Sequence, residues 1–166
     1  LLTLARNEPG AGARPTTSVD LTQLARDAVA EYAPIAEAKG VDLGLSASAA
    51  ASVTGDADAL RTLITNLIDN AVHYTPAQGR VDVGVSVDNG QPRWTVTDTG
   101  PGIPPEERTR VFDRFYRRNA TVAEGSGLGL AIVQRIAQRH HATVELADGL
   151  HGRGLTATVR FPAQTA

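Results

Sequence analysis

The sequence of 166 residues contains no cysteine, no methionine and a single lysine. Without cysteine, disulfide bridges, thiolate metal sites and cysteine nucleophiles are all excluded. The one lysine, Lys39, lies in Glu37-Ala38-Lys39-Gly40, whereas a Walker A loop needs lysine directly after its second glycine. A nucleotide site of the P-loop type is therefore excluded as well. Because methionine is missing even from position 1, we expect the sequence to be a piece of a longer protein.

Long apolar runs and a strong charge of either sign are also lacking. The apolar runs are far shorter than the ~20 residues that cross a bilayer, and no signal-peptide pattern opens the chain. The net charge of −2 offers no basic field, so we expect no direct nucleic-acid partner. The hydrophobic share of 42% and the charged share of 20% are typical of a folded globular chain.

One domain is expected at this length. Residues 1–15 are rich in proline, glycine and polar residues and predict a linker that begins with the end of a preceding helix. Residues 16–162 carry the periodic patterns of the domain, and residues 163–166 form a short tail.

The periodic patterns predict a series of helices and strands. The first helix follows Asp20 as N-cap, ends at Gly40 and should be kinked or split by Pro34, and the second runs from Asp56 to Thr75-Pro76. The other expected elements are strands at 41–46, 81–87, 93–98, 143–146 and 155–161, a short helix with Val111, Phe112, Phe115 and Tyr116, and a helix at 128–139. Grouped strands without regular βαβ alternation predict a two-layer α/β sandwich with a mixed sheet.

Polar residues line one side of the second predicted helix. Asn66, Asn70, His73 and Tyr74 follow the spacing i, i+4, i+7, i+8 and share a face beside the apolar stripe. Asparagine is a poor helix former, because its amide competes with the backbone. An amide oxygen is a ligand that suits Mg²⁺, which completes its shell with waters and phosphate oxygens. The alternative is that the two asparagines occupy a solvated helix edge.

Two glycine-rich segments come later in the chain. Asp98–Gly102 follows a strand, where two glycines permit a close approach of backbone to a ligand and Asp98 can accept a hydrogen bond from an amine. Gly125–Leu130 opens a helix, and bare amides at a helix N-terminus favour phosphate. Taken alone, the first segment is also ordinary turn chemistry and the second a hinge.

Taken in order, these segments resemble the conserved boxes of sensor histidine kinases. Asn66–Pro76 resembles their N box, Asp98–Gly102 their G1 box, Val111–Arg117 their F box, Gly125–Leu130 their G2 box, and Gly152–Pro162 their last strand. The resemblance covers about residues 16–162 and implies a Bergerat-type ATPase, a mixed and mostly antiparallel sheet packed against three main helices. It implies Mg-ATP bound between the helices and the sheet beneath a lid.

The resemblance also implies a role for individual residues. Asn70 would hold Mg²⁺ with Asn66 beside it, and Asp98 would bind the adenine amine. His73 stands where a basic residue commonly faces phosphate, and Arg117, with Arg114, would supply positive charge at the γ-phosphate. The remaining nucleotide-binding positions by this resemblance are Tyr74, Gly100, Gly102, Ile103, Gly125, Gly127, Leu128, Gly129 and Thr156.

The phosphoacceptor of such kinases is missing from the sequence. The histidines are 73, 140, 141 and 151, and none has the His-Glu/Asp-x-Arg/Lys-Thr-Pro setting of the family. By the resemblance, the chain is the cytoplasmic catalytic domain of a two-component sensor, a protein-histidine kinase. Its partners would be the His-bearing dimerisation domain of its own parent and a response regulator. We expect the isolated chain to be monomeric and the parent to be a homodimeric membrane sensor.

Two other functions are compatible with the same boxes, an anti-sigma-type serine kinase and an Hsp90- or gyrase-like nucleotide-operated module. Both carry Glu at the position of Asn66, as a general base for a hydroxyl or for water. An amide has no carboxylate to accept a proton, so Asn66 favours transfer to imidazole, which already has a lone pair.

Overall fold

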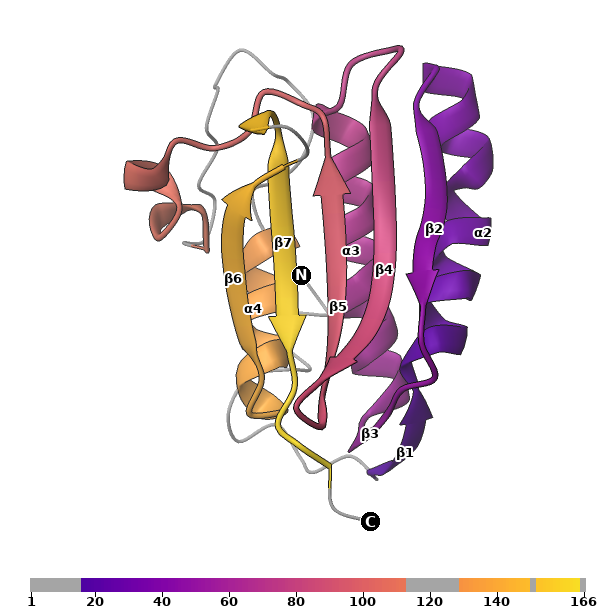
Figure 1. Cartoon of the computed structure of the whole chain (residues 1–166), viewed down its shortest axis with the longest axis vertical. Coiled ribbons are helices and arrows are strands. Elements are labelled where there is room, and N and C mark those ends of the chain that lie inside the picture. Colours follow the sequence, from indigo (N-terminus) through magenta and orange to yellow (C-terminus); the bar gives the residue numbers. More distant parts are fainter. Residues whose placement is uncertain (1–15, 113–128, 150–151, 165–166) are drawn as a thin grey trace.

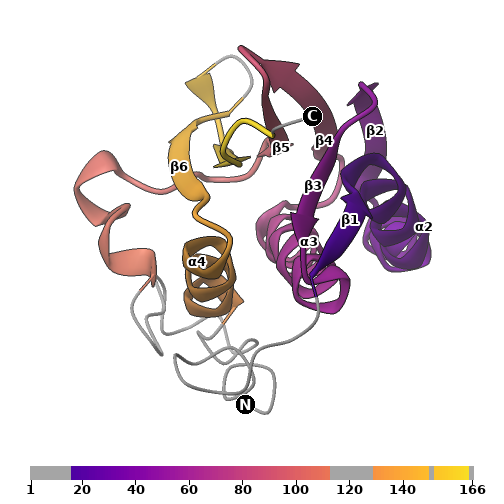
Figure 2. The same cartoon turned by 90° about the horizontal axis from the view of Figure 1, so that it is seen from below.

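The computed structural model describes residues 16–112, 129–149 and 152–164. A five-stranded sheet is covered on one face by three helices, as Figures 1 and 2 show, which confirms the predicted two-layer α/β sandwich. The elements in chain order are β1 (Thr17–Asp20), α2 (Leu21–Lys39), β2 (Asp42–Ser48), β3 (Ser52–Gly55), α3 (Ala57–Tyr74), β4 (Arg80–Asp88), β5 (Gln91–Asp98), the 3₁₀ turns η1 (Pro105–Glu107) and η2 (Arg110–Phe112), α4 (Gly129–Arg139), β6 (Thr143–Asp148) and β7 (Leu155–Arg160).

The large sheet has the strand order β2-β4-β5-β7-β6. The pair β2–β4 is parallel, and the other three pairs are antiparallel, so the sheet is mixed and mostly antiparallel as expected. The β4–β5 hairpin turns at Asn89 and Gly90, with φ angles of 53° and 75°. An Asn-Gly pair adopts these positive φ angles readily, which explains why the sequence predicted this hairpin correctly.

The core fills the space between the sheet and the helices. β4 contributes Val81, Val83 and Val85, and β5 contributes Trp94, all at most 1% exposed. The indole Nε1 of Trp94 donates to the carbonyl oxygen of Leu21 at 3.1 Å, which attaches the start of α2 to the sheet. Full burial of each such side chain stabilises the fold by roughly 1.5–3 kcal/mol.

Both ends of α2 form as the sequence indicates. The Asp20 side chain accepts from the amide of Gln23 at 3.0 Å, and Gly40 ends the helix with φ of 80°. The expected split at Pro34 does not occur, since α2 continues through it as one helix. Pro34 is exposed, so water can satisfy the carbonyl that loses its helical donor. No helix in the described ranges is long and apolar enough to cross a bilayer.

Two parts of the fold differ from the expectation. β1 and β3 pair in a small antiparallel sheet of their own, where the sequence analysis predicted no strands. Val111 and Phe112, the described part of the expected short helix, belong to the 3₁₀ turn η2, which follows the 3₁₀ turn η1. Phe115 and Tyr116, also assigned to that helix, lie outside the described residues.

Candidate functional site

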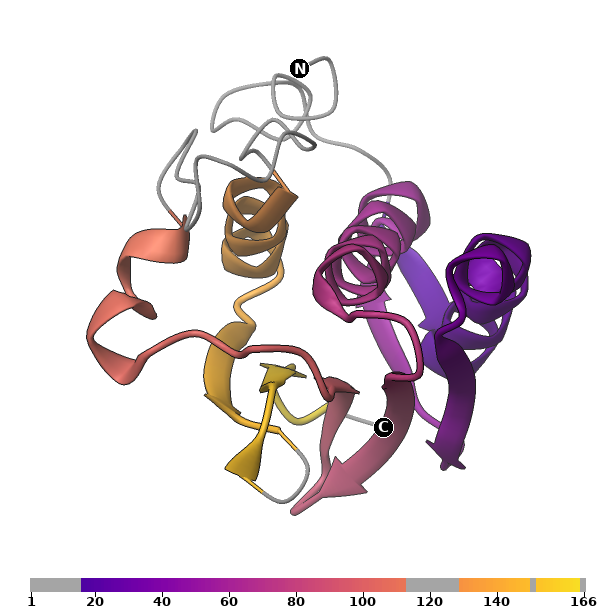
Figure 3. The ribbon, with the colours of Figure 1, turned by 90° about the horizontal axis from the view of Figure 1, so that it is seen from above.

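Several of the residues singled out in the sequence lie at one end of the molecule. The C-terminal end of α3, the end of β5 and the start of β7 lie together there, and the chain after β5 crosses this end toward η1 (Figure 3). A Cβ added to Gly100 would lie 2.9 Å from the carbonyl oxygen of Tyr74, so the loop after β5 packs directly on the end of α3.

Asp98 is the buried acid of this site, with 7% of its surface exposed. Its Oδ1 accepts from the amides of Gly100 at 2.9 Å and Leu155 at 3.1 Å. Burial raises the pKa of the Asp98 carboxyl, while the two amide hydrogen bonds act in the opposite direction. Within the described ranges both hydrogen bonds fall on Oδ1, so Oδ2 remains available to accept from a ligand amine.

Glycines let three backbone segments converge on Asp98. Gly102 has φ of 74°, and a Cβ there would lie 2.6 Å from the carbonyl oxygen of Gly154. A Cβ on Gly154 or on Gly149 would overlap the carbonyl oxygen of Asp98. The sequence pointed to Gly100 and Gly102 but gave Gly149 and Gly154 no role at the site. Only the register of β5 with β7 brings them to Asp98.

The two asparagines lie on the part of α3 that faces the start of α4. The Nδ2 of Asn66 donates to the carbonyl oxygen of Thr62 at 2.8 Å, which leaves Oδ1 as an acceptor, and a Cβ on Gly129 would lie 3.6 Å from it. Asn70 is half-buried, and among the described residues no hydrogen bond satisfies its side-chain amide. Two carboxamide oxygens that the described part of the chain leaves available fit the ligand chemistry of Mg²⁺.

His73 and Tyr74 complete the end of α3. Both are half-buried, and their rings meet edge to face with centroids 4.8 Å apart. Lys39 reaches this end from α2, where its Nζ donates to the carbonyl oxygens of Val72, at 2.8 Å, and His73. The sequence gave Lys39 no role, although as the only lysine among 16 basic residues it was conspicuous.

Thr156 is the predicted residue that the structure does not bring to Asp98. Its Oγ1 donates to the Oγ1 of Thr97 at 3.2 Å, and Thr97 is its partner across β5 and β7. Successive side chains alternate between the faces of a sheet, so Thr97 and Thr156 point away from the face on which Asp98 and Leu155 are buried.

The other predicted residues divide into two groups. Ile103 is half-buried in the loop after Gly102, and Gly129 opens α4 beside Asn66. The residues assigned to the phosphate side, Arg114, Arg117, Gly125, Gly127 and Leu128, lie outside the described residues.

Comparison with known families and proteins identifies the family and the fold. Residues 55–165 match the family described as histidine kinase-, DNA gyrase B- and HSP90-like ATPase. The sequence is 39% identical to the sensor protein kinase PmrB of Pseudomonas aeruginosa over 98% of this chain and 34% of PmrB. The chain thus spans about a third of the length of the curated relatives it matches.

Solved structures resemble the whole described fold. Full-length ShkA in complex with AMPPNP superposes with a TM-score of 0.83 and 32% identity, covering 99% of this chain and 35% of ShkA. The cytoplasmic segment of histidine kinase QseC superposes with a TM-score of 0.69 and 28% identity, over 98% of this chain and 88% of that segment.

Proposed function

Because the chain belongs to the histidine kinase-, DNA gyrase B- and HSP90-like ATPases, as the ATP-binding catalytic domain of a sensor histidine kinase, we propose that it binds Mg-ATP at the end of α3 and β5. In this proposal it transfers the γ-phosphoryl group to a histidine on a separate domain. The observation that carries the proposal is Asp98, a buried carboxylate with one oxygen held by backbone amides and the other available to the adenine amine.

Asn70 and Asn66 would hold Mg²⁺ through their amide oxygens. The bound ion would offset the negative charge of the phosphates. Asn66 is already oriented by its bond to Thr62, so its oxygen needs no rearrangement to accept a ligand. We assign His73, in the last turn of the same helix, to the phosphates.

In the transfer step the lone pair of an incoming imidazole nitrogen attacks the γ-phosphorus. A nitrogen–phosphorus bond forms, the bond to the bridging oxygen breaks, and ADP leaves with that electron pair. Positioning and charge neutralisation supply most of the catalysis in such reactions. We assign the positive charge at the γ-phosphate to Arg117 and Arg114, and a neutral Asn66 is consistent with a nucleophile that needs no base.

The proposed partners follow from the same assignment. The phosphoacceptor is a histidine of the parent's dimerisation domain, and the next acceptor is a response regulator. We propose that the parent is a homodimeric membrane sensor with this part in the cytoplasm. The sensor role and the cytoplasmic location are supported by the names of two relatives, since PmrB is named a sensor and the QseC segment is named cytoplasmic.

Calorimetry with Mg-ATP tests the binding site. We expect measurable binding by the chain and at least a ~30-fold loss in Asp98→Asn, because an amide cannot replace a charged acceptor. Asp88→Asn, in the exposed β4–β5 turn, is the matched control and should bind Mg-ATP with the same affinity as the unaltered chain. Unaltered affinity in Asp98→Asn would exclude the adenine site proposed here.

Incubation with γ-labelled ATP tests the reaction. The chain alone should acquire no stable label, whereas a separately supplied His-bearing helical domain should acquire acid-labile label. Acid-stable phosphoserine on a protein substrate would instead indicate a serine kinase, and ATP hydrolysis without transfer would indicate a nucleotide-operated module.

A further inference from the structure

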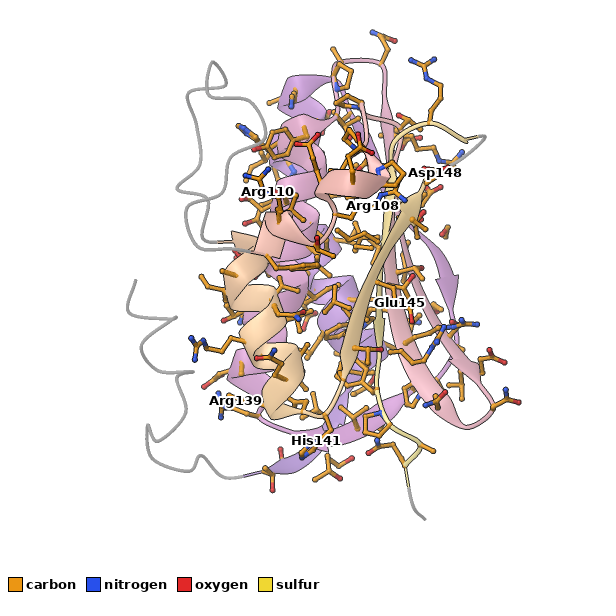
Figure 4. All side chains as sticks on the ribbon, turned by 90° about the vertical axis from the view of Figure 1, so that its left-hand side faces the viewer. Arg108, Arg110, Arg139, His141, Glu145 and Asp148 are labelled. Carbon is orange, nitrogen blue, oxygen red and sulfur yellow. The ribbon has the colours of Figure 1, made fainter. Side chains whose placement is uncertain are left out.

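Arg108 lies between the candidate site and the far edge of the sheet. It directly follows η1, and its side chain is only 19% exposed. The guanidinium Nε donates to the carbonyl oxygen of Ile103 at 2.9 Å, and Nη2 donates to Oδ1 of Asp148 at 2.7 Å. Figure 4 shows Arg108 and Asp148 next to one another, the first from the segment after β5 and the second from the end of β6.

Each partner of Arg108 is the chain neighbour of a glycine that packs on Asp98 or on Gly154, its neighbour. Ile103 follows Gly102, which lies against the carbonyl oxygen of Gly154. Asp148 precedes Gly149, where a Cβ would overlap the carbonyl oxygen of Asp98. One side chain therefore joins the loop after Asp98 to the strand end that packs on Asp98.

The chemistry of the side chain suits this task. A guanidinium is a planar fork that donates in two fixed directions, whereas an ammonium is a point charge on a flexible stem. The carbonyl of Ile103 is part of a half-buried loop, and a buried acceptor that loses its donor is costly. Lysine at this position would keep the charge but not both hydrogen bonds.

We propose that Arg108 is a positioning residue for the adenine base, which it serves by fixing the loop at Gly102–Ile103 against the Asp148–Gly149 end of β6. This inference rests on the proposed binding of ATP. Arg108 touches no nucleotide in this role and acts through the shape of the loop. The loop lies outside the buried core between sheet and helices, so its displacement leaves the fold intact.

The test compares the affinities of the full chain for ATP and for adenosine. In Arg108→Lys we expect both affinities to fall by about the same factor, roughly tenfold, because the loop and not a charge at the phosphates is altered. Asp148→Asn should lower both about threefold, since the fork keeps a neutral partner. The double variant should bind no worse than Arg108→Lys, because the two residues act through one contact.

A second arginine–acid pair provides the control. Arg160 Nη1 lies 3.4 Å from Glu145 Oε1 and joins the last residue of β7 to the same edge strand β6, at the end of β7 that is remote from Asp98. Arg160→Lys should leave both affinities unchanged. Thermal unfolding without nucleotide should show one cooperative transition for every variant, which establishes that each variant is folded.

Three results would overturn the inference. Wild-type affinity of a folded Arg108→Lys for both ligands would remove the positioning role. A loss for ATP with unchanged adenosine affinity would make Arg108 a phosphate-binding charge instead. Failure of the unaltered chain to bind ATP would overturn the proposed function and, with it, this inference.

Discussion

The two ends of α3 satisfy their polar groups in different ways. At the N-terminal end, Asp56 Oδ1 accepts from the amides of Asp58 and Ala59 at 3.1 and 3.2 Å, and the amide of Asp56 donates to Nε2 of His140 at 3.1 Å. At the C-terminal end, Lys39 donates to two backbone carbonyls, but the side-chain amide of Asn70 has no hydrogen-bond partner among the described residues.

This difference separates stability from binding along one helix. Where side chains of the chain itself satisfy the helix end, a substitution should lower the free energy of unfolding and leave nucleotide affinity alone. Where polar groups are left to a ligand, a substitution should lower affinity and leave the fold alone. Each of the following experiments breaks or sharpens that separation.

Asn70→Ala should have the largest effect. Affinity for Mg-ATP should fall about 100-fold, as for loss of a metal-orienting group. Stability should stay equal or rise by ~0.5 kcal/mol, because alanine is the better helix former. Calorimetry with and without Mg²⁺, and urea unfolding, measure the two quantities. Asp69→Asn, the exposed neighbour, is the control, and equal losses of stability and affinity in Asn70→Ala would abolish the separation.

Asp56→Ala should show the reverse pattern. Loss of the N-cap leaves two amides without their acceptor and removes the partner of Arg139 at 3.8 Å. We expect the free energy of unfolding to fall by about 1–2 kcal/mol. The affinity of Asp56→Ala for Mg-ATP should match that of the unaltered chain when both are measured under conditions in which they are folded. A loss of affinity as large as that in Asn70→Ala would contradict this.

Lys39→Met tests a residue that we expect to affect both the stability of the fold and the affinity for nucleotide. The substitution removes the donor to the carbonyls of Val72 and His73 and the positive charge at the helix C-terminus, and should cost about 1 kcal/mol of stability. Because Tyr74 O packs against Gly100, a modest loss of affinity should accompany it. Lys39→Arg, which keeps the charge, should restore part of the stability in urea unfolding.

The stability of the N-terminal end should also depend on pH. Burial chiefly lowers the pKa of His140, whose Nδ1 donates to the carbonyl oxygen of Ile136 at 2.8 Å while Nε2 accepts from Asp56. Arg139 and His141 add to the shift, and Ile136 and Asp56 oppose it. The folded state thus binds fewer protons than the unfolded state, and stability is lost as the pH falls below ~6.5.

Urea unfolding at several pH values between neutrality and mild acid checks this expectation against His140→Gln, which does not titrate. The unaltered chain should lose more stability on acidification than the variant. The difference in the free energy of unfolding should be smaller than the loss expected for Asp56→Ala. Equal pH slopes in the two proteins would show that His140 does not couple protonation to folding.

His141→Gly should have the smallest effect, and a favourable one. His141 follows α4 with φ of 56°, a conformation that glycine adopts without strain. We expect a gain of about 0.5 kcal/mol, reduced by the greater freedom of glycine in the unfolded state. His141 is exposed and lies next to His140, which contacts the N-terminal end of α3, so we expect unchanged affinity for Mg-ATP. A drop in the melting temperature would refute the assignment of backbone strain to His141.

Local signals explain which parts of the fold the sequence predicted. The caps Asp20 and Asp56, the stop at Gly40 and the Asn89-Gly90 turn act within a few residues of themselves, and all appear in the structure. The pairing of β1 with β3 joins two four-residue strands far apart in the chain, so neither strand carries enough pattern to be recognised.

The site divides in the same manner. The helical spacing of Asn66 and Asn70 and the position of Asp98 at a strand end can be read from the sequence. The face on which Thr156 lies depends on the phase of β7, and the contact of Arg108 with Asp148 spans 40 positions. Only the tertiary structure determines those two, and it corrected one expectation and supplied one residue.

The 3₁₀ turns beside the site have a consequence for how fast it opens. Backbone hydrogen bonds from Glu107 to Pro104, at 2.9 Å, and from Arg108 to Pro105, at 3.3 Å, close η1, whereas β4 and β5 are paired along their full lengths. Amides of residues 106–112 should therefore exchange with deuterium through local openings, long before those of the hairpin. Nucleotide would then enter and leave at the rate of these local openings, which is independent of the rate at which the sheet unfolds.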